Sequence, residues 1–304
     1  YDAFTVGETV FVTPKMADDL VNPTREELST VFAFEHMETD CYKIKWFLRR
    51  FNPDCFFACL TKWQKALPWN TVYLENHDQP RSVSRFGNDT QYHDESAKAL
   101  ATLVLTLRGT PFLYEGQEIG MTNFDFPDMQ KVRDVESINI WNIGKRLHLP
   151  RSLRWRMIKT KSRDNARTPM QWDNSANKGF STAAADKLYL PVDDTADAPT
   201  VAAQQADPDS LWHTVQGVLN FRHSHRDLDS DAPFHVRFAP KAKGSYRPFA
   251  WERGKLICAV NPAREEAELP LKLEDGTRVL HVIGKAEVKG DELVLGAQSF
   301  AILG

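Results

Sequence analysis

A short apolar run that ends abruptly in polar residues constrains the fold of this chain more than any other feature. The run Thr71-Val72-Tyr73-Leu74 consists largely of β-formers, as a buried parallel strand requires, and Glu75-Asn76-His77-Asp78 follows it directly. Pro80 then stops strand pairing because it lacks a backbone donor. In parallel α/β folds, chemistry is found at the C-terminal ends of the strands. Taken alone, however, this stretch favours an Asx turn with a locally bonded His77 over a functional site.

The same arrangement occurs three more times, and this repetition favours a functional site over an isolated turn. The β-rich runs Ala3–Glu8, Val31–Phe34 and Thr110–Tyr114 each end in or lead into acidic residues. Stretches of helical periodicity separate these runs, the clearest being a helix predicted over Asp94–Arg108 with its first residue as cap. Alternation of this kind predicts an α/β fold with a parallel sheet, whose C-terminal edge carries the polar side chains.

A long excursion follows the last of these strands, from Asn123 to about Gln205, and it contains the second polar motif. Arg163 and Arg167 lie four residues apart with Asp164 and Asn165 between them. Two arginines at this spacing fit a loop that clamps hydroxyls or carboxylates. Standing alone, the segment would be read as a surface salt-bridge loop.

The periodicity changes from helical to alternating after a last helix, which is predicted from Ser210 to about His225. Short alternating runs separated by tight turns begin at Pro233, and Leu256–Val260 is an example. Turns at this spacing predict a small antiparallel β-sandwich domain. The domain boundary is therefore expected near Asp231, with residues 1–231 in one domain and 232–304 in the other.

The composition narrows the class of protein. The chain has 304 residues, of which 42% are hydrophobic and 26% are charged, with a net charge of -3. This is an ordinary balance that can bury a core, and it offers no basic patch for nucleic acid. No apolar run approaches the length of a transmembrane helix, so no membrane partner is evident.

The cysteines and the histidines form no recognisable metal or disulfide pattern, so no metal or cofactor is expected. The four cysteines, with no C-x-x-C pair among them, are Cys41, Cys55, Cys59 and Cys258. Sparse, unpatterned thiols favour a reducing compartment, and the expected location is cytoplasmic. The chain opens on Tyr1 and shows no signal peptide.

Taken together and in order, these motifs resemble the α-amylase family, glycoside hydrolase family 13, and in particular its oligo-1,6-glucosidase and α-glucosidase branch. The string Arg167-Thr168-Pro169-Met170-Gln171-Trp172-Asp173 is a specific marker of that branch. The resemblance covers nearly the whole chain and implies a (β/α)8 TIM barrel followed by a β-sandwich. The segments that carry it are Phe4–Glu8, Phe34–Met37, Glu75–Arg81, Ser84–Asp89, Glu118–Met121 and Arg163–Asp173.

The resemblance implies roles for two carboxylates. Glu8 matches the general acid/base of the family, and Asp78 matches the carboxylate that stabilises the transition state. A retaining glycosidase needs an acid that protonates the leaving oxygen and a second carboxylate as nucleophile, about 5 Å apart. The acid requires a raised pKa, which burial or a neighbouring carboxylate such as Asp78 supplies.

The resemblance also implies substrate-binding residues around these carboxylates. His77 matches a histidine that binds sugar hydroxyls, while Arg163 and Arg167 match arginines that line the sugar pocket. Phe34 and Glu136 match positions that touch the neighbouring sugar. We therefore expect Glu8, Asp78 and both arginines to converge on one pocket at the C-terminal ends of the strands.

One departure from the family pattern matters more than any match. The nucleophile of the family is an aspartate in a Gly-Phe-Arg-x-Asp motif on the strand before that of Glu8, and this chain has no such motif. We therefore expect the C-terminal half of a barrel, inactive alone, with the missing N-terminal half as a possible partner. Any structural calcium site is expected in that missing half. Glu35 and Glu115 are the nearest alternative acids, but they follow the wrong strands.

Three interpretations of function remain open at this point. The first is an exo-acting α-glucosidase that hydrolyses short α-linked gluco-oligosaccharides. The second is a trehalose-6-phosphate hydrolase or a sucrose isomerase of the same family. The third is the non-catalytic transporter heavy chain, an interpretation that retention of Glu8, His77 and Asp78 disfavours. Two segments rich in Arg, Lys and aromatic residues, Tyr42–Phe57 and His148–Lys161, fit no predicted element.

Overall fold

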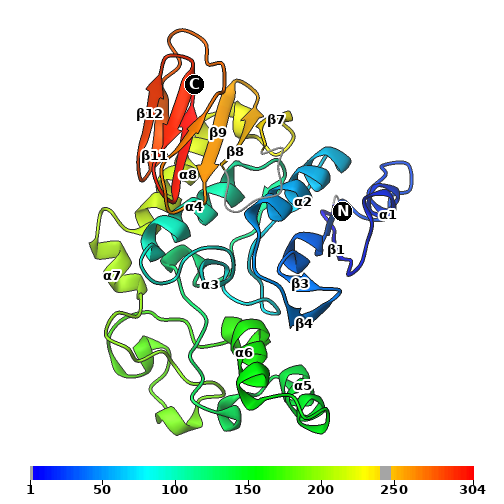
Figure 1. The fold of residues 1–304 in the computed structure, drawn as a ribbon, viewed down its shortest axis with the longest axis vertical. Helices are drawn as coiled ribbons and strands as arrows, with labels where there is room; N and C mark the ends of the chain where they lie inside the picture. Colours follow the sequence, from blue (N-terminus) through cyan, green and yellow to red (C-terminus); the bar gives the residue numbers. More distant parts are fainter. Residues whose placement is uncertain (1–2, 240–247) are drawn as a thin grey trace.

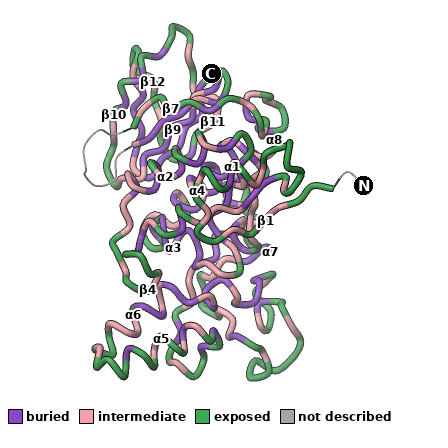
Figure 2. Tube along the Cα trace, turned by 90° about the vertical axis from the view of Figure 1, so that its right-hand side faces the viewer, coloured by how far each residue is buried: buried purple, intermediate pink, exposed green. Residues whose placement is uncertain are grey.

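The structure is a computed structural model that describes residues 3–239 and 248–304. Antiparallel strands of the C-terminal segment gather at one end of the molecule, and helices α5 (Val135–Arg146) and α6 (Arg151–Lys161) lie at the other end (Figure 1). The parallel strands and helices α2 (Pro53–Ala66) and α4 (His93–Thr106) lie between these ends. Figure 2 shows that buried residues are concentrated toward the C-terminal strands and α4.

Four short parallel strands carry the predicted polar ends. Strand β1 (Val6–Glu8) pairs with β2 (Thr30–Phe32), and β5 (Thr71–Val72) pairs with β6 (Thr110–Pro111). The two pairs adjoin each other, because the Thr71 hydroxyl donates to the carbonyl of Val31 at 2.9 Å. The four strands form two separate two-stranded sheets, and the strands are parallel within each pair, as predicted.

These strands are shorter than the sequence predicts. The run expected to extend through Leu74 pairs only as far as Val72. Beyond that point the carbonyl of Tyr73 accepts a hydrogen bond from the ring of His36, at 3.0 Å, in place of a strand partner. Burial raises the cost of leaving such a carbonyl unpaired, so the side chain of His36 takes over the role of a neighbouring strand. Burial also lowers the pKa of His36 to about 4.

The bounds predicted for the helix after β5 need two corrections. Asp94 is not the cap of α4, because Tyr92 is the N-cap residue and Asp94 lies in the first turn, where it pairs with Lys98 at 2.6 Å. The helix also ends at Thr106 and not at Arg108. The last helix, α8 (Leu211–Ser224), begins after the predicted cap, since the side chain of Ser210 accepts a hydrogen bond from the backbone of His213.

Part of the first unassigned segment forms a hairpin, and most of the second forms helix α6. Strands β3 (Cys41–Tyr42) and β4 (Ile44–Leu48) are antiparallel. Trp46 of the hairpin is buried in a cluster with Met157 and Ile158 of α6 and with Phe126. The remaining α-helices in the described part of the chain are α1 (Pro14–Leu20), α3 (Ser82–Phe86) and α7 (Val201–Ala206).

The strands after Pro233 are antiparallel, as predicted, and form two sheets. One sheet has the order β11-β14-β9-β8-β7 and the other β10-β13-β12. Buried aliphatic side chains from both sheets, such as Ala301 and Leu293, share one core. The strands are β7 (Phe234–Phe238), β8 (Phe249–Arg253), β9 (Leu256–Asn261), β10 (Ala267–Leu269), β11 (Val279–Ile283), β12 (Ala286–Lys289), β13 (Glu292–Leu295) and β14 (Ser299–Leu303).

A buried arginine joins these sheets to the helical part of the chain. Arg253 is fully buried and donates to the carbonyl of Thr106, the last residue of α4, at 2.6 Å and to the carbonyl of Asp229 at 2.6 Å. A cation at this position also complements the negative end of the helix dipole. Burial lowers the pKa of Arg253 to about 10, which leaves the guanidinium charged at neutral pH.

Arg253→Met is therefore expected to destabilise the protein. Methionine fills the apolar part of the site but leaves the buried carbonyl of Thr106 without the donor of Arg253, which costs roughly 1–3 kcal/mol. Urea unfolding followed by circular dichroism measures the change. The exposed neighbour Lys255→Met is the control and should unfold like the wild type. Equal midpoints for both variants would contradict the role of Arg253.

Candidate active site

The site begins at a turn that follows strand β5. The side chain of Asn76 accepts a hydrogen bond from the backbone of Asp78 at 2.8 Å, and its carbonyl accepts one from the backbone of Gln79 at 3.2 Å. This is the Asx turn that the sequence favours. The turn does not oppose a functional site, because it holds the carboxylate of Asp78 at the end of the sheet.

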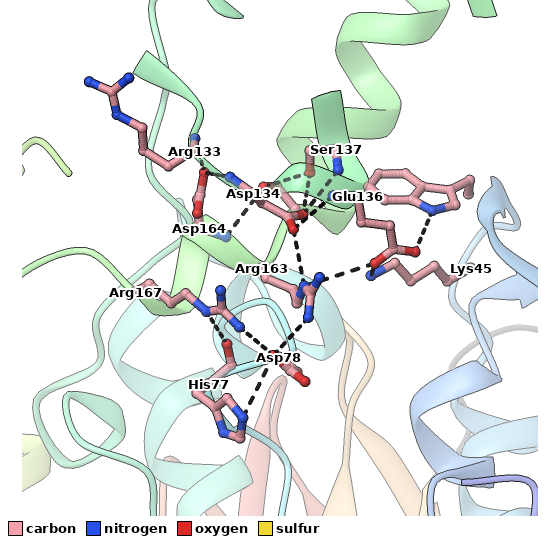
Figure 3. Close-up of polar contacts among 12 residues, drawn as sticks. Lys45, His77, Asp78, Arg133, Asp134, Glu136, Ser137, Arg163, Asp164 and Arg167 are labelled. Atoms are coloured by element: carbon pink, nitrogen blue, oxygen red, sulfur yellow. Dashed lines mark hydrogen bonds and ion pairs between the residues drawn. The ribbon is translucent and has the colours of Figure 1, made fainter. Parts of the chain in front are cut away.

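Two arginines and a histidine converge on one oxygen of Asp78 (Figure 3). The Arg167 guanidinium donates to Oδ1 at 2.5 Å, and that of Arg163 reaches the same oxygen at 3.4 Å. The Nε2 atom of His77 lies 3.7 Å from it. Arg167 also donates to the carbonyl of His77 at 2.8 Å, so its orientation is fixed by two contacts. The two polar motifs, far apart in the sequence, thus meet at Asp78.

Arg163 is held from its other side by carboxylates at the start of α5. Its Nε atom donates to Asp134 at 3.1 Å and lies 3.9 Å from Glu136. Burial acts to lower the pKa of Arg163, but the charges of Asp134 and Asp78 outweigh it and raise the pKa above its ordinary value. The guanidinium therefore stays charged and bridges two parts of the site (Figure 3).

Asp134 is in turn fixed by the chain around it. It is the N-cap residue of α5 and accepts hydrogen bonds from the backbone and hydroxyl of Ser137. Burial acts to raise its pKa, but the Ser137 and Arg163 contacts bring the pKa below its usual value. The buried carboxylate of Asp164 accepts from the backbone of Arg133 at 2.6 Å and from that of Asp134 at 2.9 Å. The loop of the two arginines is thus tied to the helix start.

Glu136 is bound from the hairpin side. Lys45 pairs with it at 2.5 Å, and the indole of Trp46 donates to it at 2.9 Å. Both contacts come from β4, so the hairpin that the sequence left unassigned forms one wall of the site. The one sequence signal for this wall is the pair of consecutive residues Lys45 and Trp46, in a segment that otherwise shows no regular pattern.

A cavity of ≈ 370 Å³ joins most of the predicted residues. Its lining includes Glu8, Phe34, Asp78, Glu136 and Arg163, while His77 and Arg167 are outside the lining and contact Asp78. The sequence interpretation missed the other lining residues. These are Val10, Phe11, Met37, Glu38, Lys43, Ile44, Lys45, Gln79, Pro80, Arg85 and Lys161.

The two alternative acids that follow neighbouring strands are placed elsewhere. Glu35 pairs with Lys62 and accepts a hydrogen bond from the indole of Trp63 at 2.9 Å. Glu115 lines a different cavity, of ≈ 660 Å³, together with residues of α8. Neither lines the cavity of Glu8 and Asp78.

The family can now be assigned from comparison with known proteins. The family model described as alpha amylase, catalytic domain, matches residues 1–231. This chain belongs to the α-amylase family. The glycoside hydrolase resemblance of the sequence motifs is thereby confirmed.

Curated relatives within the α-amylase family are glucosidases. An oligo-1,6-glucosidase of Parageobacillus thermoglucosidasius is 44% identical over 231 residues, which are 74% of this chain and 40% of that protein. A glucan 1,6-alpha-glucosidase of Streptococcus dysgalactiae subsp. equisimilis is 38% identical over 243 residues, which are 78% of this chain and 45% of that protein. The chain thus spans less than half the length of these relatives.

Solved α-amylase-family structures match the whole chain. A trehalose-6-phosphate hydrolase of Bacillus licheniformis superposes with a TM-score of 0.89 at 30% identity, covering 100% of this chain and 56% of that one. A trehalulose synthase variant superposes with a TM-score of 0.90 at 30% identity, with the same coverage. These neighbours have a TIM barrel and a C-terminal antiparallel sheet domain, in agreement with the predicted α/β fold class.

Two further observations concern only the residues that the structure describes. Across residues 3–239 and 248–304, no group of three or more His, Cys, Asp and Glu side chains is arranged to hold a metal ion. Within the same ranges, none of the helices is long and apolar enough to cross a membrane.

Asp134→Ala is expected to loosen both α5 and Arg163. Loss of the N-cap costs about 1 kcal/mol, and Arg163 loses a partner on the side away from Asp78. Amide hydrogen exchange of the first turn of α5 should accelerate, while that of α8 should not. Asp128→Ala, which removes an exposed cap from a short 3-10 helix, serves as the control. Unchanged exchange in α5 would contradict the role given to Asp134.

Proposed function

We propose that this chain carries the acid/base part of a retaining, exo-acting α-glucosidase active site. The observation that supports this function best is the shared cavity of Glu8 and Asp78, with Asp78 held by Arg163 and Arg167. A paired acid and carboxylate at the ends of parallel strands is the arrangement that glycoside hydrolysis requires.

Glu8 acts as the general acid and then as the general base. In the first step its proton passes to the leaving glycosidic oxygen, while a carboxylate nucleophile bonds to the anomeric carbon and the C–O bond breaks. In the second step Glu8 takes a proton from water, which displaces the nucleophile. Both steps require that Glu8 reach the glycosidic oxygen from the cavity that it lines.

Asp78 and its cationic neighbours bind the glucosyl ring. The carboxylate of Asp78 accepts hydrogen bonds from sugar hydroxyls that strengthen in the transition state. Arg163 and Arg167 keep the carboxylate oriented, and His77, whose side chain is 64% exposed, is accessible to a sugar hydroxyl. Phe34 and Glu136 then contact the leaving sugar on the other side of Glu8.

The proposal assigns the nucleophile to a part of the protein that this chain does not include. Two further carboxylates line the cavity, Glu38 and Glu136. Both oxygens of Glu136 are engaged, by Lys45 and Trp46. Burial raises the pKa of Glu38, which disfavours the ionised form that a nucleophile needs. Relatives more than twice as long as the matched segment are consistent with a nucleophile elsewhere.

The same proposal makes this chain half of a TIM barrel. The hydrogen bond from Thr71 to Val31 places β5 beside β2, which leaves β1 and β6 as the edges at which further strands would join and complete the barrel. The cavity beside β6 supports this reading, since apolar side chains of Leu113, Trp212 and Leu219 line it. A separate N-terminal half is the partner that would cover it.

Short α-linked gluco-oligosaccharides are the proposed substrates. Curated relatives at 38–44% identity bear oligo-1,6-glucosidase, glucan 1,6-alpha-glucosidase and alpha-glucosidase names. A phosphorylated disaccharide is the second candidate, because the trehalose-6-phosphate hydrolase matches the whole chain and Lys43 and Lys45 line the cavity. The proposed location is cytoplasmic.

Glu8→Gln in the complete protein is expected to lower kcat on isomaltose by roughly 10²–10⁴, with isomaltose binding largely preserved. The amide fills the space of the carboxylic acid but has no proton to give in the transition state. p-Nitrophenyl α-glucoside, whose leaving group needs little protonation, should lose less in its first step.

The control is Glu38→Gln, which changes another glutamate of the same cavity. It should leave the ratio of rates on the two substrates unchanged. A Glu8→Gln enzyme that kept its rate on isomaltose would remove Glu8 from the acid/base role.

A further inference from the structure

A buried ionic joint, formed by Asp40, Arg85 and Lys161, adjoins the candidate site, and its two cations are among the residues that line the cavity. Asp40, only 5% exposed, accepts two hydrogen bonds from Arg85, at 2.9 and 2.8 Å, and one from Lys161 at 2.6 Å. Arg85 and Lys161 are themselves 8% and 2% exposed. The three residues come from three separate segments: the chain after Glu35–Glu38, helix α3 and the last residue of α6.

Each cation of this joint is close to one partner of the contact between Asp78 and Arg163. Arg85 donates to the side chain of Gln79 at 2.6 Å, and Gln79 is the residue after Asp78. Lys161 is separated from Arg163 by a single residue. Asp40 thus connects the segment that carries Asp78 with the segment that carries Arg163.

We propose that Asp40 and Lys161 are positioning residues that set how closely Arg163 approaches Asp78. The joint acts on the site through the backbone between Lys161 and Arg163: Lys161 lines the cavity but is only 2% exposed and directs its ammonium to Asp40. Its consequence for sugar binding rests on the proposed function of the site.

The buried ion pairs of the joint are better suited to holding side chains in one geometry than to stabilising the fold. A buried ion pair gains little over well-packed apolar residues, since removing the charges from water is costly. Charge-assisted hydrogen bonds are strongly directional, however, and hold their partners in one geometry. Burial acts to raise the pKa of Asp40, but Arg85 and Lys161 bring it below its usual value. Burial lowers the pKa of Lys161 to about 8, so the ammonium persists at neutral pH.

Lys161→Met tests the proposal in the 304-residue chain. The substitution keeps the apolar stem and leaves Asp40 paired with Arg85. Side-chain NMR reports the exchange rate of the Nε–H proton of Arg163, which is donated to Asp134. We expect this rate to rise at least about tenfold, because freeing the segment favours local opening. The Nε–H proton of Arg167, bonded to the carbonyl of His77, should keep its rate.

Two variants accompany this measurement. Lys161→Arg retains a cation for Asp40 and should restore most of the slow exchange of Arg163. Lys178→Met removes another buried lysine, bonded to Asn174 and Thr195, and should leave both arginines unchanged.

A second measurement in the complete protein links the joint to ligand binding. Lys161→Met and Arg163→Ala should each weaken isomaltose binding, and the double variant should bind no more weakly than Arg163→Ala alone. Additive losses would mean that Lys161 acts independently of Arg163 and would overturn the proposal. If the wild-type protein bound no isomaltose, the proposed function would fail while the exchange result would still decide the joint.

Three further results, two of them from hydrogen exchange, would also overturn the proposal. The first is a folded Lys161→Met chain in which Arg163 exchanges at the wild-type rate. The second is an equal acceleration of both arginines, which would show general loosening. The third is failure of both Lys161 variants to fold, which would make the lysine a requirement of the fold.

Discussion

The contact between Asp78 and the two arginines is the interaction on which the arrangement of this molecule depends. It joins the end of strand β5 to a loop 85 residues further along the chain, at 3.4 Å for Arg163 and 2.5 Å for Arg167. These contacts hold the carboxylate of Asp78 in one orientation at the end of the sheet, because charge-assisted hydrogen bonds are strongly directional. The loop and the helices beyond it are therefore fastened to the sheet at the point where the chemistry is proposed.

Successive layers support that contact. Asp134 and Asp164 fix the loop to the start of α5, and the hairpin of Lys45 and Trp46 holds Glu136 beside it. The bond from Arg163 to Asp134 is partly buried and charge-assisted, the kind that fixes geometry more than it adds stability. A glycosidase site benefits from such fixed groups, because donors and charges that are already oriented need no reorganisation as the transition state forms.

The sequence predicted the parts of this site that are local and missed those that depend on distant partners. The polar residues after each β-rich run mark Glu8 and Asp78, and the spacing of Arg163 and Arg167 marks the clamp. The position of Asp40 carries no such signal, since its partner Lys161 lies 121 residues away. The hairpin was missed because its exposed Tyr42, Ile44 and Phe47 hide the alternation of a strand, while Cys41 and Trp46 are its buried residues. Asp94 was wrongly predicted to cap α4. An aspartate near a helix start is typical both of an N-cap and of the first turn, and here it lies in the first turn and pairs with Lys98.

Hydrolysis of p-nitrophenyl α-glucoside by the purified 304-residue chain, with size-exclusion chromatography alongside, tests the central claim most directly. That claim is that Glu8 and Asp78 supply an acid and a stabilising carboxylate but no nucleophile. The account predicts no turnover above background from the chain alone, and turnover when a separately made N-terminal portion carrying the family's aspartate is added. Turnover well above background from a monomer of this chain would contradict it.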